Sequence, residues 1–166
     1  MGKIERKYLA HFINTAAPAA PAAEPVYERL GKDLEEYSPE LAAEVETKEN
    51  IIGETTVSIH GYKKTGSVEP FYADKNSALF PRLQAIIDDS LILDDLMTDV
   101  VEVKLWEGEG TSYPAIKEVA YIEVSRYGGD NTGYQIPFTL HYTGIKTKGT
   151  FDIKTKTFTA TQAAAQ

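Results

Sequence analysis

Strict alternation of apolar and polar residues over 134–143 constrains this chain more than any other feature. An extended segment there divides into an inward row and an outward row of side chains. The inward row is Ile136, Phe138, Leu140 and Tyr142, and the outward row is Gln135, Thr139, His141 and Thr143. A period of two is that of a β-strand, so the segment is predicted to lie in a sheet with one covered face.

A single segment has the period of a helix instead. Its apolar residues are Leu79, Leu83, Ile86 and Ile87, which form one stripe at i, i+4, i+7 and i+8. Asn76 or Ser77 is the expected N-cap, and Pro81 suits the first turn. Asp88 and Asp89 are disfavoured by the helix dipole near a C-terminus, which predicts that the helix ends about there.

Period-two segments dominate the rest of the chain, with about seven strands expected. Those read with definite bounds are 8–14, 26–30, 55–62, 99–107, 115–126, 134–143, 144–153 and 155–161. Apolar residues on both faces of 115–126 indicate a strand that is covered on both sides. The predicted fold class is therefore mainly β (α+β): a β-sandwich or partly open β-barrel with one packed α-helix.

Irregular segments divide what we expect to be one domain spanning 1–166. Three prolines make 15–25 an exposed Ala/Pro-rich loop. Residues 32–54 are rich in charge and lack a clean period, so they are expected to form a long excursion that could contain a hairpin. Residues 63–73 are interpreted as a plain connection, and 161–166 as a flexible tail.

Composition excludes several kinds of chemistry. The 166-residue chain has a net charge of -8, which argues against a protein that grips nucleic acid through Lys and Arg. It contains no cysteine, so disulfides and thiolate sites are excluded. No run of about 18 apolar residues occurs, so no membrane span is expected.

Residues with catalytic or metal-binding potential do not form a recognisable pattern. His11, His60 and His141 lie in separate predicted strands and lack the spacing of a zinc site. The acidic residues between Asp88 and Asp99 lack the alternating ligands of a calcium loop. We therefore expect no enzymatic activity, no catalytic residues, no cofactor and no metal.

Four segments resemble, in the same order, major tail proteins from prophages of Gram-positive bacteria: 27–37 (YERLGKDLEEY), 45–55 (VETKENIIGET), 70–74 (PFYAD) and 127–130 (YGGD). The similarity runs from about residue 8 to residue 152. Each segment alone is a weak signal, whereas four in order over most of the chain are fairly specific. The Ala/Pro-rich loop departs from this pattern and looks like a local insertion.

The resemblance implies a tail tube protein of a long-tailed, siphovirus-type bacteriophage. Such subunits form hexameric rings that stack helically into a hollow tube, and double-stranded DNA passes through the tube during ejection without sequence-specific contacts. The implied fold is tail-tube-like, with its helix on the outer side of the tube. Implied partners are other copies of the chain, the tape measure protein, and the tail terminator and distal tail proteins. The implied location is the virion tail, assembled in the cytoplasm of the bacterial host.

Two sets of residues acquire expected roles from this resemblance. The excursion is expected to act as an inter-ring stacking arm through Lys32, Glu35, Glu36, Glu44, Glu46, Lys48 and Glu49. The polar faces of two strands are candidates to line the lumen, through Thr56, Ser58, His60, Glu102 and Lys104. An acidic lumen would repel DNA and keep it sliding, whereas a basic one would hold each phosphate.

Three alternatives remain open at this stage. A tube subunit of a contractile tail, bacteriocin-like particle or secretion machine of related fold would also assemble, and a sheath partner would identify it. A carbohydrate-binding β-sandwich at the particle tip would show an aromatic-lined groove and form a low-order oligomer. An enzyme would need a catalytic constellation, which the sequence does not offer.

Overall fold

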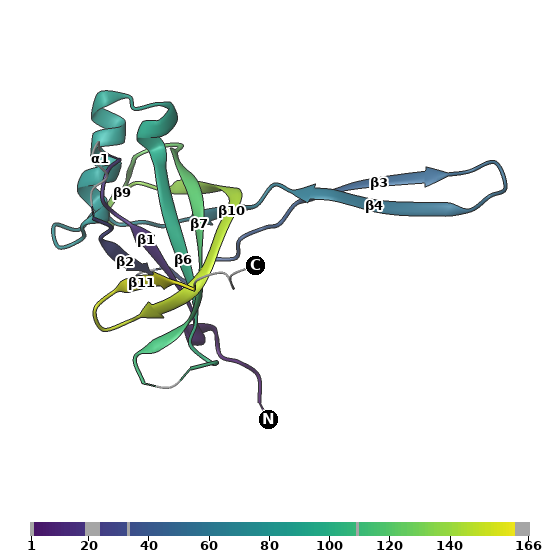
Figure 1. Cartoon of the computed structure of the whole chain (residues 1–166). Helices are drawn as coiled ribbons and strands as arrows, with labels where there is room; N and C mark the ends of the chain where they lie inside the picture. The colour runs from purple at the N-terminus through teal and green to yellow at the C-terminus, as the bar shows by residue number, and fades with distance from the viewer. Residues whose placement is uncertain (1, 19–23, 33, 109, 162–166) are drawn as a thin grey trace.

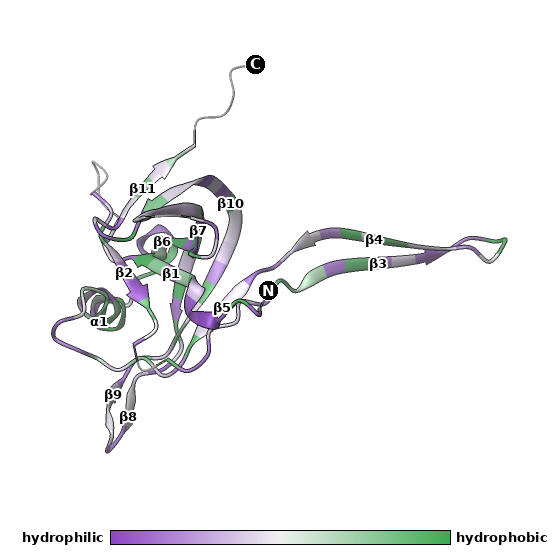
Figure 2. Cartoon of the chain, turned by 90° about the horizontal axis from the view of Figure 1, so that it is seen from below, coloured by the Kyte–Doolittle hydropathy of each residue, from purple (hydrophilic) through white to green (hydrophobic). Residues whose placement is uncertain are grey.

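Seven strands form one antiparallel sheet. The computed structural model describes residues 2–18, 24–32, 34–108 and 110–161 (Figure 1). The strands of this sheet are β1 (Leu9–Asn14), β2 (Tyr27–Leu30), β5 (Thr65–Val68), β6 (Met97–Lys104), β7 (Ser112–Val124), β10 (Phe138–Asp152) and β11 (Thr157–Ala160). Their order is β11-β10-β7-β6-β1-β2, and β5 pairs with another part of β10. The sheet curls into a half-barrel, which we call the body (Figure 2).

The predicted fold class is confirmed: the protein is mainly β, with one α-helix, α1 (Leu79–Asp89), in the described part of the chain. Of the two architectures left open by the sequence, the sheet adopts the partly open barrel. Two hairpins stand apart from this sheet (Figure 2). They consist of β3 (Ala43–Glu49) with β4 (Thr55–Tyr62), and of β8 (Gly128–Asp130) with β9 (Gly133–Gln135).

Apolar side chains cover both faces of the central strands. Adjacent residues go to opposite faces, so that Val100 joins one buried cluster while Val101 joins the other. The first cluster contains the buried face of α1 together with residues of β1, β7 and β10. The second is built around Phe151, whose ring lies 4.5 Å from that of Phe12. The expectation that 115–126 is covered on both sides holds only in part. Ala120 and Ile122 of β7 join the first cluster and Ala115 joins the second, but the row that continues from Ala115 through Lys117, Val119 and Tyr121 is only partly buried.

The helix packs as its spacing predicts but starts differently. Leu79, Leu83 and Ile86 are buried, and the helix ends at Asp89. The N-cap position is Ala78, not Asn76 or Ser77 as predicted. The first N–H groups are satisfied partly locally and partly from β2: Ser77 accepts a hydrogen bond from the Leu79 N–H at 3.2 Å, and Glu28 accepts one from the Ala78 N–H at 3.0 Å.

Residues 63–73 are not a plain connection, since they contain β5. This strand is short and includes Gly66, so it has no detectable period. Its position is set by pairing with β10, where Leu140 lies opposite Gly66. Only glycine fits there, because an added Cβ would lie 2.2 Å from the Tyr37 hydroxyl oxygen. A tertiary contact therefore specifies the strand that sequence patterning missed.

The two strands expected over 134–143 and 144–153 are largely one strand. β10 begins at Phe138 and runs continuously to Asp152, whereas residues 134 and 135 of the first predicted strand belong to β9. The expected turn is a bulge, with a register shift between Tyr142 and Lys146. Gly144 adopts a φ of 85° within it. Of the expected Ala/Pro-rich loop and flexible tail, residues 19–23 and 162–166 lie outside the described part of the chain.

Candidate assembly surfaces

A hairpin projects from the body as a long ribbon, which we call the arm (β3–β4, Ala43–Tyr62) (Figure 1). Its turn is held by Asn50, whose side-chain oxygen accepts hydrogen bonds from the N–H groups of Ile52 at 3.1 Å and Glu54 at 3.0 Å. Gly53 supplies the positive φ of 83° that the turn requires. The residues Asn50 and Gly53 therefore form a tight turn that ends the hairpin at this point.

The two faces of the arm differ in chemistry. Val45 pairs with Ile59 and Thr47 with Val57, so that three large aliphatic side chains share one face. They are all more than half exposed, at 57% for Val45 and Ile59 and 62% for Val57. Isolated two-stranded ribbons are marginally stable in water, and contiguous exposed apolar surface usually marks a contact site. This face is therefore the strongest candidate for contact with another molecule.

The opposite face of the arm is polar. Glu46 lies opposite Ser58, and its carboxylate contacts His60 Nε2 at 2.7 Å and Lys48 Nζ at 3.3 Å. Both interactions are solvent-exposed and contribute little to stability. The arm is thus an amphipathic ribbon. Side chains on its polar face contact one another and solvent, whereas its apolar face is uncovered.

The root of the arm is fixed to the body by backbone hydrogen bonds. Glu40 and Thr65 bond each other in both directions, at 2.7 and 2.9 Å, and the Lys63 N–H donates to the carbonyl of Leu41 at 3.0 Å. The N–H of Tyr142 in β10 donates to the Lys64 carbonyl at 2.9 Å. These hydrogen bonds at the root, next to β5 and β10, therefore fix the direction in which the arm leaves the body.

A buried polar network lies beneath this root. Lys64 Nζ donates to Glu118 at 3.1 Å, and the two side chains are only 16% and 5% exposed. The ammonium group also lies 4.4 Å from the centre of the Tyr142 ring. Glu118 accepts a second hydrogen bond from the Gly144 N–H at 3.1 Å, and the hydroxyls of Tyr142 and Tyr37 are 2.6 Å apart. Both ends of the ion pair therefore have a second protein partner: the Tyr142 ring for Lys64 and the Gly144 N–H for Glu118.

Burial shifts the titration of this network. Desolvation raises the pKa of Tyr37 to about 12, and raises the pKa of Tyr142 further, with added repulsion from its partner Tyr37. Both hydroxyls therefore stay neutral at physiological pH. Next to them, the hydrogen bond from His11 holds the pKa of Glu102 below its ordinary value, against the effect of burial.

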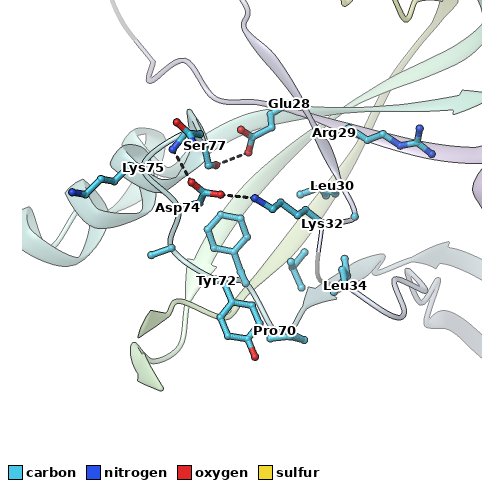
Figure 3. A pocket seen from close by; sticks show the side chains of 15 residues that line it. Glu28, Arg29, Leu30, Lys32, Leu34, Pro70, Tyr72, Asp74, Lys75 and Ser77 are labelled. Atoms are coloured by element: carbon cyan, nitrogen blue, oxygen red, sulfur yellow. Dashed lines mark hydrogen bonds and ion pairs between the residues drawn. The ribbon is translucent and has the colours of Figure 1, made fainter. Parts of the chain in front are cut away.

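A groove of about 560 Å³ lies on the body between β2 and the segment 70–77 that leads into α1 (Figure 3). Two bridges tie its walls together: Lys32 Nζ donates to Asp74 at 2.5 Å, and Ser77 donates to Glu28 at 2.7 Å. An adjoining hollow of about 550 Å³ continues from Gly31 towards the N-terminal segment. The two hollows share Arg29, Leu30, Gly31, Lys32 and Leu34 and so form one extended concavity, which no sequence pattern predicted.

The residues expected in the stacking arm fall in two places. Glu44, Glu46, Lys48 and Glu49 lie on β3, whereas Lys32, Glu35 and Glu36 lie on the body before the arm begins. The excursion was predicted over 32–54, whereas the arm begins at Ala43 and ends at Tyr62. The reason is that β4 serves as the second strand of the arm.

The lumen candidates also separate. Thr56, Ser58 and His60 lie on the polar face of the arm, outside the main sheet. Glu102 and Lys104 do lie in the main sheet, on β6. Glu102 is turned towards His11, at 3.2 Å, on the face that also carries Lys64 and Glu118. The five residues therefore do not form one surface within a single copy.

The network below the arm root was missed from the sequence, although one signal was visible. Glu118 stands in a row with Ile116, Ala120 and Ile122, which is otherwise apolar. A carboxylate in such a row is rarely buried without a partner. The partner itself, Lys64, comes from a segment that was interpreted as a loop, so the sequence could not identify it.

Comparison with protein-family models gives no match, and comparison with curated proteins gives none either. Within residues 2–18, 24–32, 34–108 and 110–161, no three His, Asp or Glu side chains are grouped so that they could hold a metal ion. The helices of these same residues are too short or too polar to cross a membrane.

Proposed function

We propose that this protein is the structural subunit of a phage tail tube, which acts by self-assembly and not by catalysis. The observation that carries the proposal is the uncovered apolar face of an arm whose root is rigidly fixed to a well-packed body. Such an arm has a defined shape and direction but lacks a partner. Other copies of the chain, in hexameric rings stacked helically, would supply one.

The arrangement of surfaces supports assembly without limit along one direction. The arm leaves one side of the body, whereas β2 and α1 lie on the other side (Figures 1 and 2). Contacts between two different surfaces are heterologous, and they generate closed rings or open stacks. The sheet also ends in two short strands, β2 and β11, whose outer edges are available for pairing with neighbouring copies.

The acidic character of the chain suits the passage of DNA. A net charge of -8 provides repulsion from phosphate groups, so that DNA would slide along the tube instead of adhering. Under this proposal the protein resides in the virion tail after assembly in the bacterial cytoplasm. Its neighbours there are the tape measure, tail terminator and distal tail proteins.

Two substitutions on adjacent residues of β4 test the proposal. Val57→Glu places a charge on the apolar face of the arm, and Thr56→Glu places the same charge on the polar face opposite Lys48. We expect tubes from wild type and Thr56→Glu in negative-stain microscopy, and dispersed subunits with an unchanged melting temperature from Val57→Glu. A wild-type protein that remains monomeric at high concentration would overturn the proposal. If Val57→Glu forms normal tubes, the apolar face of the arm is not an assembly contact.

A further inference from the structure

The groove between β2 and 70–77 combines an apolar lining with a local excess of basic residues. Leu30, Leu34 and Phe71 line it and pack against the first core cluster from its outer side. The groove and the adjoining hollow together are lined by five Lys or Arg and three Asp or Glu. The local excess of positive charge contrasts with the -8 of the whole chain. The surface is thus suited to a ligand that is both apolar and acidic.

The tip of the arm has this character. Ile51 and Ile52 stand side by side at the turn and are among the most exposed large apolar residues of the protein, at 104% and 74%. Glu49 and Glu54 flank them. Within Ala43–Tyr62 there are four glutamates and one lysine, so the arm carries a negative charge of its own. Its tip therefore has two exposed aliphatic side chains with glutamates on either side.

We infer that the groove is the receptor for the arm tip of a second copy of this chain, with Ile51 and Ile52 seated against Leu30, Leu34 and Phe71. This inference rests on the proposed function and adds the docking site to it. A volume of about 560 Å³ is within the range of pockets that hold ligands larger than two side chains. The cations around the groove then face the glutamates of the tip, within the range of screened attraction.

The partner must be another copy, because the arm projects away from the body and carries its tip far from β2, which forms one wall of the groove (Figures 1 and 2). The tip of a rigidly rooted arm cannot fold back across the sheet to reach its own groove. A second copy placed head to tail presents its tip at the groove of the first. Each copy then both donates a tip and receives one, which makes the contact heterologous and repeatable.

Cysteine cross-linking tests this contact directly, because the chain contains no cysteine of its own. Full-length Ile52→Cys is mixed with full-length Asn76→Cys, at the rim of the groove, with a tag that distinguishes the two chains by size. The matched control replaces Asn76→Cys by Thr155→Cys, in the exposed turn between β10 and β11. Because docking raises the effective concentration of the two thiols, we expect about ten-fold more heterodimer with Asn76→Cys than with Thr155→Cys.

A charge exchange provides a second test that does not depend on thiol geometry. Lys75→Glu reverses an exposed cation that lines the groove, and Glu49→Lys reverses an anion next to the tip. We expect each single variant to weaken assembly about ten-fold in sedimentation and the double variant to recover most of it. Unchanged melting temperatures would show that the effect lies in docking and not in folding.

The outcomes separate this inference from the proposed function. One set of results would overturn the groove as receptor and leave the tube proposal standing. In that case tubes form normally, cross-linking is equal at Asn76→Cys and Thr155→Cys, and the double variant does not recover assembly. A wild-type protein that forms no assembly would overturn both. Preferential cross-linking at Asn76→Cys together with recovery in the charge exchange supports the docking site.

Discussion

The body and the arm are built from the same alternation of apolar and polar residues, but only the body covers its apolar rows. On β6, Val100 is buried on one face of the sheet and Val101 on the other, and β7 buries the row of Glu118, Ala120 and Ile122. In the described part of the chain every buried side-chain nitrogen or oxygen has a hydrogen-bond partner. On β3 all seven residues are exposed. Alternation therefore specifies a strand in both regions, and the presence or absence of a covering layer decides whether that strand becomes core or contact surface.

The comparison also separates two sources of order. The body is held by apolar burial on two faces of the sheet, which is the dominant favourable term in folding. The arm is held by its turn, its cross-strand hydrogen bonds and its root, which together make a two-stranded ribbon only marginally stable. We therefore expect the arm to open locally with the body intact, and to gain stability when a second molecule covers it.

The largest expected difference concerns equivalent truncations in the two regions. Phe151→Ala removes a fully buried ring that contacts Phe12 and Tyr27, and should lower the free energy of unfolding by about 3–5 kcal/mol. Ile59→Ala on the arm should change it by less than about 0.5 kcal/mol, because the side chain is already exposed. Urea denaturation of the monomeric protein measures both. Similar losses would mean that the arm is part of the cooperative fold.

The next prediction compares two neighbouring lysines at the arm root. Lys64→Ala leaves Glu118 buried without its counterion and should cost about 3 kcal/mol. Lys63→Ala breaks only the exposed pair with Glu44, at 2.9 Å, and should cost less than about 0.5 kcal/mol. Thermal and urea unfolding distinguish them. A small effect of Lys64→Ala would show that water solvates Glu118 at the root.

A pH-dependent prediction follows from Glu102, whose pKa is lowered in the folded state mainly by the hydrogen bond from His11. A depressed pKa stabilises the fold above the unfolded value of about 4.5, and this contribution is lost as pH falls through the folded value. Glu102→Gln should therefore cost about 1 kcal/mol at pH 7 and little at pH 3. In the exposed pair of His141 with Glu123, Glu123→Gln should change stability little at either pH. Urea titrations at the two pH values compare both variants.

The smallest global effect is expected at the arm tip. Asn50→Ala removes the acceptor of two backbone hydrogen bonds, so amide exchange along β3 and β4 should accelerate while global unfolding is unchanged. Asp152→Ala removes a similar acceptor, for the N–H groups of Lys154 and Thr155 in the body, and should lower the urea midpoint of global unfolding. Amide exchange and urea melts measure the two. Protection of the arm amides in Asn50→Ala equal to wild type would contradict the marginal stability of the arm.

Errors in the sequence predictions cluster where a partner segment decides the outcome. The bounds of β4 were predicted as the structure has them, but its place on the arm was not, because a strand pattern does not reveal the neighbour with which it pairs. The strand β5 was missed because its pattern is weak and its pairing with β10 is non-local. The N-terminus of α1 was predicted only in part: Ser77 accepts the Leu79 N–H, but the N–H of Ala78 is satisfied by Glu28, which comes from β2.

By itself, the sequence determined the mainly β class, the bounds of β1, β2 and β4 to within one residue, the stripe of α1, the end of the helix at Asp89 and the absence of disulfides. These features follow from side-chain periodicity, local turn chemistry and composition, which act between residues close in the chain. Tertiary structure alone decided the curl of the sheet, the buried pair of Lys64 with Glu118, the groove beside β2 and the exposure of the arm. Each of these depends on which distant segment covers a face, and burial is a property of two surfaces together.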